Sequence, residues 1–148
     1  MSRISGQARS ASRLAAVQAL YQIDMERPAL HLLLDEFHMH RLGAEIEDVE
    51  YAKADIAFFD DIVRGVDARR EEIDAVLTAR LAKGWAIARL DKTMLQILRA
   101  GTYELMARND VAIGTAISEY VDVAHAFFDE REAKFVNGIL DAVAKDVR

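Results

Sequence analysis

Apolar residues recur along this chain at spacings of three and four, which is the period of an α-helix. Strictly alternating β-branched stretches are absent, alanine is abundant and Pro28 is the only proline, so the pattern predicts an all-α fold. We expect a compact bundle of six or seven helices. The predicted helices run from Ser10 or Ser12 to Met25, from Ala29 to Arg41, from Lys53 to Val63, between Val66 and Leu81, from Asp91 to Leu105, from Ile113 to Phe127, and from Phe135 to Val143.

Residues with special backbone roles mark the ends of these helices. Ser10 or Ser12 can cap the first helix, and Pro28 forces it to stop. Gly65 separates the third predicted helix from the fourth, and Asp91 is an acceptable N-cap for the next one. These residues predict short, well-separated helices.

The first predicted helix has one apolar face. Its inner stripe consists of Leu14, Val17, Leu20 and Tyr21. This register leaves Arg9, Arg13 and Gln18 to face elsewhere. Periodicity therefore places the ring of Tyr21 in the core; the alternative is an exposed ring on which a base could stack.

Charge is distributed unevenly along the sequence. The 148 residues carry a net charge of −6, yet residues 1–23 hold Arg3, Arg9 and Arg13 and no acid, so the other 125 residues have a net charge of −9. An acidic stretch follows Gly43, in Glu45, Glu47, Asp48 and Glu50. We interpret residues 1–148 as a single helical domain whose residues 1–9 form a flexible basic arm. Such asymmetry suggests contact with nucleic acid; the alternative is a merely soluble tail.

The composition bears on where in the cell the protein is expected. The chain has no cysteine and no apolar run of 18 residues, so we expect a cytoplasmic protein without disulfides and without a membrane span. Its hydrophobic fraction of 52% is ample for a core.

The side chains offer little chemistry for catalysis. His38 and His40 are two residues apart and point to different sides of a helix, so they cannot share a metal ion. The adjacent acids Asp60 and Asp61 diverge in the same way. The seven glycines form no nucleotide-binding loop. We therefore predict no metal, no cofactor and no enzymatic activity.

Five stretches are more specific than amphipathic helices require. They are AAVQALYQ (15–22), FFDDIVRGV (58–66), ILRAGTYEL (97–105), ISEYVDVA (117–124) and KFVNGILD (134–141). In this order and at these spacings, the chain closely resembles the NusB family of bacterial transcription antitermination factors, from about Ala8 to Val143.

The resemblance implies two small helical sub-bundles packed together. It also implies an antitermination factor that binds the boxA element of nascent ribosomal RNA through its basic arm, together with NusE, a protein of the small ribosomal subunit. The pair would then join an antitermination complex on RNA polymerase and promote processive transcription of ribosomal RNA. The competing hypothesis is a helical protein-interaction adaptor that makes no contact with nucleic acid. An apolar surface patch could serve a second copy or the partner, which leaves both a monomer and a homodimer open.

The resemblance implies seven side chains for RNA binding, and the physics of RNA binding supports the arginines and the aromatic rings among them. The seven are Arg3, Arg9, Arg13, Gln18, Tyr21, Phe127 and Lys134. Arginines can pair with phosphates, and aromatic rings can stack bases of a single strand. Phe127 and Phe128 are neighbours about 100° apart on a helix, so one of them is expected at the surface. Met94 and Arg131 stand where family members often carry acids on the side of the protein partner.

Overall fold

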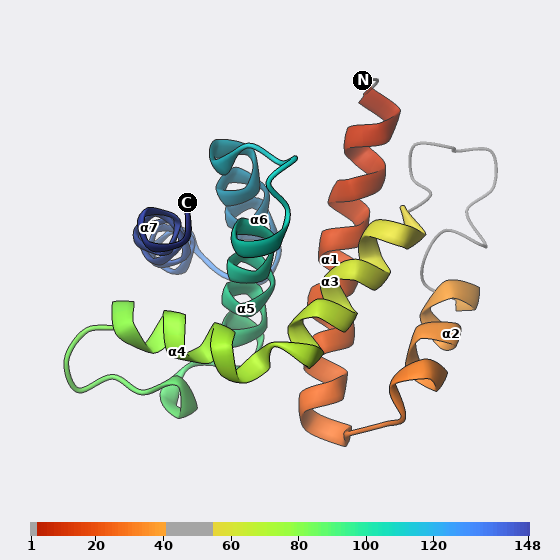
Figure 1. Cartoon of the computed structure of the whole chain (residues 1–148), viewed down its shortest axis with the longest axis horizontal. Coiled ribbons are helices and arrows are strands. Elements are labelled where there is room, and N and C mark those ends of the chain that lie inside the picture. The colour runs from red at the N-terminus through yellow and green to blue at the C-terminus, as the bar shows by residue number, and fades with distance from the viewer. Residues whose placement is uncertain (1–2, 41–54) are drawn as a thin grey trace. The chain divides into compact units, whose positions relative to one another are not determined.

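The computed structural model describes the backbone of residues 3–40 and 55–148, and the side chains of 6–39 and 55–148. Within these ranges the prediction of an all-α fold is confirmed, and the structure has seven α-helices and one short 3₁₀ helix (Figure 1). They are α1 (Arg3–Glu26), α2 (Leu30–His40), α3 (Ile56–Ala68), α4 (Arg70–Arg80), η2 (Ile87–Arg89), α5 (Lys92–Ala107), α6 (Ile113–Phe127) and α7 (Glu130–Val147). The predicted helix ends at Arg41 and Lys53, Gly43, and the acidic stretch from Glu45 to Glu50 lie outside the described residues.

The chain divides into two compact units, Met1–Arg64 and Gly65–Arg148. The first unit contains α1, α2 and most of α3, and the second contains the end of α3 and all later helices. None of the described helices is long and apolar enough to cross a membrane.

The core of the first unit joins all three of its helices. Leu20 of α1, Phe37 of α2 and Phe59 of α3 are almost completely buried. The rings of Phe37 and Phe59 stack with their centroids 5.5 Å apart. Beside them, His38 Nε2 lies 2.7 Å from Asp60 Oδ1, which links α2 to α3.

Helix α1 begins at Arg3, several residues before the predicted start at Ser10 or Ser12. Neither serine caps the helix. The hydroxyl of Ser10 donates to the carbonyl of Gly6 one turn earlier, and the hydroxyl of Ser12 donates to the carbonyl of Asp55 at 2.7 Å. Arg9 lies within α1.

The second unit is built around α5, in which every residue from Met94 to Leu105 is buried. Helices α4, α6 and α7 pack against it, and α7 lies across α5 and α6 (Figure 1). The predicted N-cap is confirmed, because the carboxylate of Asp91 accepts from the amides of Thr93 and Met94 at 2.8 and 3.1 Å. Capping and burial together give α5 a defined start and a fixed place in the core.

The break predicted at Gly65 is wrong, since α3 continues to Ala68 and the chain turns at Arg69. Gly65 is needed for space. A Cβ built on Gly65 would lie 2.1 Å from Cζ of the buried Tyr103. The absence of a side chain therefore allows α5 to approach this helix closely.

Several polar side chains inside the second unit are paired. The hydroxyl of Tyr120 donates to the buried carboxylate of Glu104 at 2.9 Å. Arg99 makes a bidentate pair with Asp74, with N···O distances of 2.9 and 2.8 Å. The guanidinium of Arg148 donates to backbone carbonyls that follow the last turn of α5, including that of Val111 at 2.7 Å. These contacts tie α4, α6 and α7 to α5.

Three predicted core residues of the last two helices are partly exposed. Ile113 and Phe135 are each 38% exposed, and Phe127 is 42% exposed. The rest of that apolar pattern is buried, as predicted. The two exposed side chains of α6, Ile113 and Phe127, are its first and last residues, whereas its buried residues lie between them.

Candidate nucleic-acid interface

Arg9 and Arg13 of α1 meet at the ring of Phe58 in the first unit. Their guanidinium carbons lie 4.5 and 4.9 Å from the ring centroid, within the range of a cation–π contact. Phe58 is brought to this position by the N-terminal end of α3, where its amide donates to Asp55 Oδ1 at 2.9 Å. The two arginines are four positions apart, which places them on one side of the helix, but this spacing alone does not identify Phe58 as their shared contact.

The two arginines differ in how far they reach solvent. The side chain of Arg9 is 33% exposed, and its Nε lies 3.6 Å from Asp55 Oδ2. Arg13 is only 3% exposed, so the expectation that it faces away from the core is wrong. The apolar stem and flat guanidinium of arginine allow this burial against an aromatic ring. Of the two, Arg9 is the side chain that can meet a phosphate on the surface.

Gln18 and Tyr21 are three residues apart and lie on one exposed face of α1. Tyr21 is 40% exposed, so its predicted burial is wrong. Leu20 takes the inward position instead, and the neighbouring residue is rotated by about 100° away from it. The alternative interpretation of Tyr21, a ring available for stacking, is compatible with this geometry. The backbone of Arg3 begins α1, and its side chain lies outside the described residues.

Phe127 and Lys134 belong to the second unit. Phe127 is exposed at the end of α6 and Phe128 is partly buried, which confirms that one of the two rings reaches the surface. Their centroids are 6.4 Å apart. Lys134 lies on the exposed side of α7 and lines an open groove of about 500 Å³ between α6 and α7. An aromatic face and a cation are thus both available in this unit.

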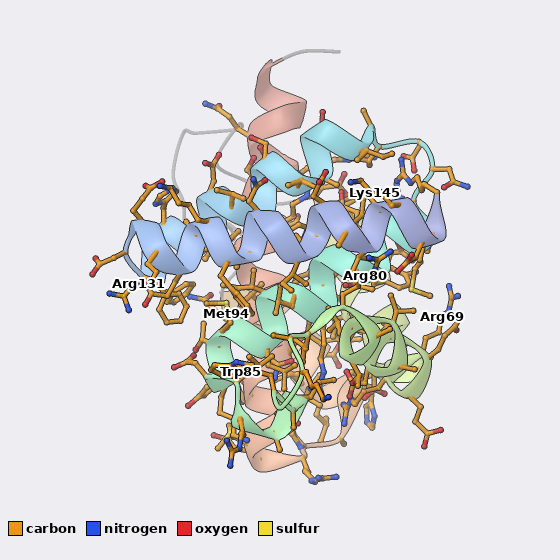
Figure 2. The ribbon with its side chains drawn as sticks, turned by 90° about the vertical axis from the view of Figure 1, so that its left-hand side faces the viewer. Arg69, Arg80, Trp85, Met94, Arg131 and Lys145 are labelled. Carbon is orange, nitrogen blue, oxygen red and sulfur yellow. The ribbon has the colours of Figure 1, made fainter. Side chains whose placement is uncertain are left out.

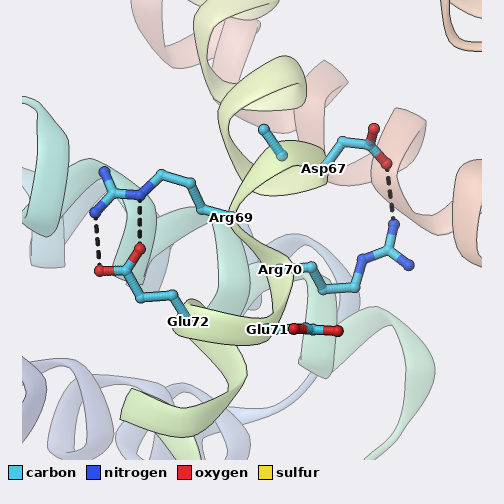
Figure 3. Close-up of a pocket in the computed structure, with 6 residues that line it drawn as sticks. Asp67, Arg69, Arg70, Glu71 and Glu72 are labelled. Atoms are coloured by element: carbon cyan, nitrogen blue, oxygen red, sulfur yellow. Dashed lines mark hydrogen bonds and ion pairs between the residues drawn. The ribbon is translucent and has the colours of Figure 1, made fainter.

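A second hollow lies where α3 meets α4, and both of its arginines are already paired with acids (Figure 3). Arg69 donates to Glu72 at 2.9 and 3.0 Å, and Arg70 donates to Asp67 at 3.2 Å. The hydrogen bond from Arg69 lowers the pKa of Glu72 below its ordinary value, which keeps the carboxylate charged. This hollow therefore offers an anion no unpaired cation.

Met94 and Arg131 have different environments. Met94 is buried near the start of α5, whereas Arg131 is exposed in the first turn of α7. Elsewhere in the described residues, no group of three or more His, Cys, Asp and Glu side chains is placed to hold a metal ion.

Comparison with known proteins gives a consistent result. The profile of the NusB family matches residues 10–145. The transcription antitermination protein NusB of Novosphingobium aromaticivorans is 81% identical over 148 residues and is covered completely, as is this chain. A solved structure of T. maritima NusB has a TM-score of 0.77 and 31% identity, covering 93% of this chain and 91% of its own. A crystal structure of the antitermination factors NusB and NusE in complex with dsRNA has a TM-score of 0.76 and 26% identity, covering 93% and 96%. This chain belongs to the NusB family.

Proposed function

We propose that this protein is a cytoplasmic transcription antitermination factor that binds the boxA element of nascent ribosomal RNA together with NusE. The bound pair joins the antitermination complex on RNA polymerase and promotes processive transcription. One observation carries the proposal: the chain is similar over 93% of its length to a structure in which NusB is bound to NusE and RNA.

The surface chemistry of the chain supports RNA as the ligand. Arg9, partly exposed over Phe58, can pair with phosphate. Tyr21 and Phe127 present exposed rings on which bases can stack, and Lys134 adds an exposed cation. Gln18 beside Tyr21 can form hydrogen bonds with a base edge. Arg3, the first residue of α1, is the remaining cation proposed to contact RNA.

The number of cations sets the expected affinity. Neutralising three or four phosphates of a single strand predicts that log K falls with log salt at a slope of roughly −2 to −3. Binding by this protein alone is therefore weak at physiological salt, and we propose that NusE supplies the rest of the RNA surface.

Fluorescence polarisation with a labelled boxA RNA and a scrambled control tests this function. We expect tight, sequence-selective binding when NusE is present and much weaker binding without it. Equal affinity with and without NusE contradicts the shared surface. Binding to NusE without any RNA binding favours the protein-interaction adaptor, to which the excess of 25 acids over 19 bases also points. Size-exclusion chromatography of the free protein distinguishes a monomer from a homodimer.

Replacing Arg9 with Ala tests the surface cation. We expect weaker boxA binding and a salt slope reduced in magnitude by about 0.7, the share of one phosphate on a single strand. Arg64→Ala is the matched control, because it removes the same charge from an exposed position of the first unit. Equal losses in the two variants would show that only net charge matters.

A further inference from the structure

Trp85 is the most unusual exposed side chain of the second unit. It lies between α4 and α5, is 56% exposed, and is the only tryptophan in the chain. Figure 2 shows it toward the same end of the unit as Met94 and Arg131. Its immediate neighbours in the sequence, Gly84 and Ala86, are small. A large ring left mostly in water indicates a binding role more than a packing role.

The segment that carries Trp85 has a defined backbone. Its amide donates to the carbonyl of Ala82 at 2.9 Å, and Gly84 just before it adopts a φ of +90°, which favours glycine. The 3₁₀ helix η2 follows, and the buried Leu90 anchors its far end in the core. The ring is therefore presented by an ordered turn, so little entropy is lost when a ligand binds.

Three cations lie within seven residues of Trp85 in the sequence. Lys83, Arg89 and Lys92 are all exposed, and within the described part of the chain their side chains form no ion pair or hydrogen bond. The acid in this segment, Asp91, is committed to capping α5. The surface formed by Lys83, Trp85, Arg89 and Lys92 is called the Trp85 patch below.

The cations near Trp85 in the sequence differ from most of the arginines of this unit. Most of the arginines have an acidic partner within 3.2 Å, including Arg69, Arg80 and Arg99. Arg80 and Asp146 hold each other in a bidentate pair that raises the pKa of the guanidinium and lowers the pKa of the carboxylate. In a chain with more acids than bases, three exposed cations in the segment that carries the indole concentrate positive charge there.

We infer that the Trp85 patch is a second contact for single-stranded RNA, in which a base stacks on the indole ring and adjacent phosphates pair with Lys83, Arg89 and Lys92. The inference rests on the proposed RNA-binding function and extends it to a segment that the sequence prediction did not include. A protein ligand is less favoured, because an exposed aromatic ring in a segment that also carries three exposed cations complements bases and phosphates better than it complements an apolar side chain.

The single tryptophan makes the test direct. Intrinsic fluorescence excited at the indole band is followed while boxA RNA is added to the protein with NusE, and the Trp85→Phe variant serves as the blank for any signal from NusE. We expect quenching that saturates at the same RNA concentration as the polarisation signal, and reduced quenching by acrylamide in the complex. RNA binding with unchanged fluorescence overturns this inference and leaves the proposed function standing. No RNA binding in the presence of NusE overturns both.

The RNA affinity of variants in the Trp85 patch provides a second test. Trp85→Ala should weaken RNA binding roughly 5-fold or more, because stacking contributes about that much per base, and Trp85→Phe should retain part of it. Arg89→Ala should lower the magnitude of the salt slope by about 0.7. Lys145→Ala is the control, since it removes a charge from an exposed position on α7 and should leave binding unchanged. Equal affinity of wild-type and Trp85→Ala, with unchanged thermal melts, overturns the inference.

Discussion

Arg13 separates a structural role from an RNA-binding role most sharply. It was nominated as a phosphate contact, but it is 3% exposed and lies over the ring of Phe58. Replacing Arg13 with Ala should therefore destabilise the first unit. Arg9→Ala should affect the stability much less, because Arg9 is more exposed and its ion-pair distance to Asp55 is 3.6 Å.

The size of the effect follows from what is removed. A desolvated cation–π contact contributes about 2 kcal/mol, and two buried methylenes contribute about 0.8 kcal/mol each. Allowing for relaxation, Arg13→Ala should lower the free energy of unfolding by about 2–4 kcal/mol, which corresponds to a fall in Tm of roughly 4 °C or more for a chain of this size. Arg9→Ala should cost about 1 kcal/mol or less.

Circular dichroism at 222 nm during thermal and urea unfolding measures these differences. Arg13→Met provides the matched control, because it keeps a long apolar stem beside Phe58 and removes the guanidinium with its charge and N–H donors. We expect the stability order wild-type, Arg13→Met, Arg13→Ala. Unchanged melting of Arg13→Ala together with a loss of RNA affinity would refute the structural role and restore Arg13 as a direct phosphate contact.

Further predictions concern the second unit. Gly65→Ala should destabilise this unit by about 1–3 kcal/mol through overpacking, because the new Cβ would meet an aromatic ring at 2.1 Å. A Cβ on Gly138 would have nothing within 4 Å, so Gly138→Ala should raise the stability by up to about 1 kcal/mol. Thermal melts of the two variants measure this difference. Asp91→Ala removes the N-cap of α5 and should cost about 1 kcal/mol in urea unfolding, while Asp91→Asn should retain most of it. The hydrogen bond from Arg80 lowers the pKa of Asp146 below its ordinary value of 3.8, so the pair stabilises the fold above that pH and the contribution is lost as pH falls through the lowered pKa. The Tm difference between wild-type and Asp146→Asn should therefore shrink as the pH is lowered through that range, and a constant difference would contradict the role of this pair.

Much of the fold could be predicted because helix period and capping are local properties. Asp91 was identified as an N-cap from residue type alone, and the structure shows both hydrogen bonds. The role of Gly65 could not be read in this way, because a glycine that breaks a helix and a glycine that admits a neighbouring ring look the same in one sequence. The start of α1 was misplaced for a similar reason: the hydroxyl of Ser12 bonds to Asp55, a residue 43 positions later.

The candidate site was less predictable than the fold. Residue type and the resemblance selected Arg13 and Tyr21, but whether each side chain points inward depends on the exact rotation of α1 against its neighbours. One position along a helix changes the direction of a side chain by about 100°. A rotation of this size separates the predicted exposure of Arg13 and burial of Tyr21 from the burial and exposure that the structure shows. The exposure of Trp85 could not be predicted, because an apolar residue in an irregular segment belongs to no periodic pattern from which its burial follows.

Asp55 uses its two carboxylate oxygens for separate purposes. Oδ1 accepts the amide of Phe58 and holds the first turn of α3, whereas Oδ2 faces the guanidinium of Arg9. A phosphate that draws Arg9 away would therefore take a partner from Oδ2 and leave the helix cap in place. The arginine can exchange one anion for another while the local backbone stays unchanged, so RNA can be captured and released here without partial unfolding of the unit that captures it.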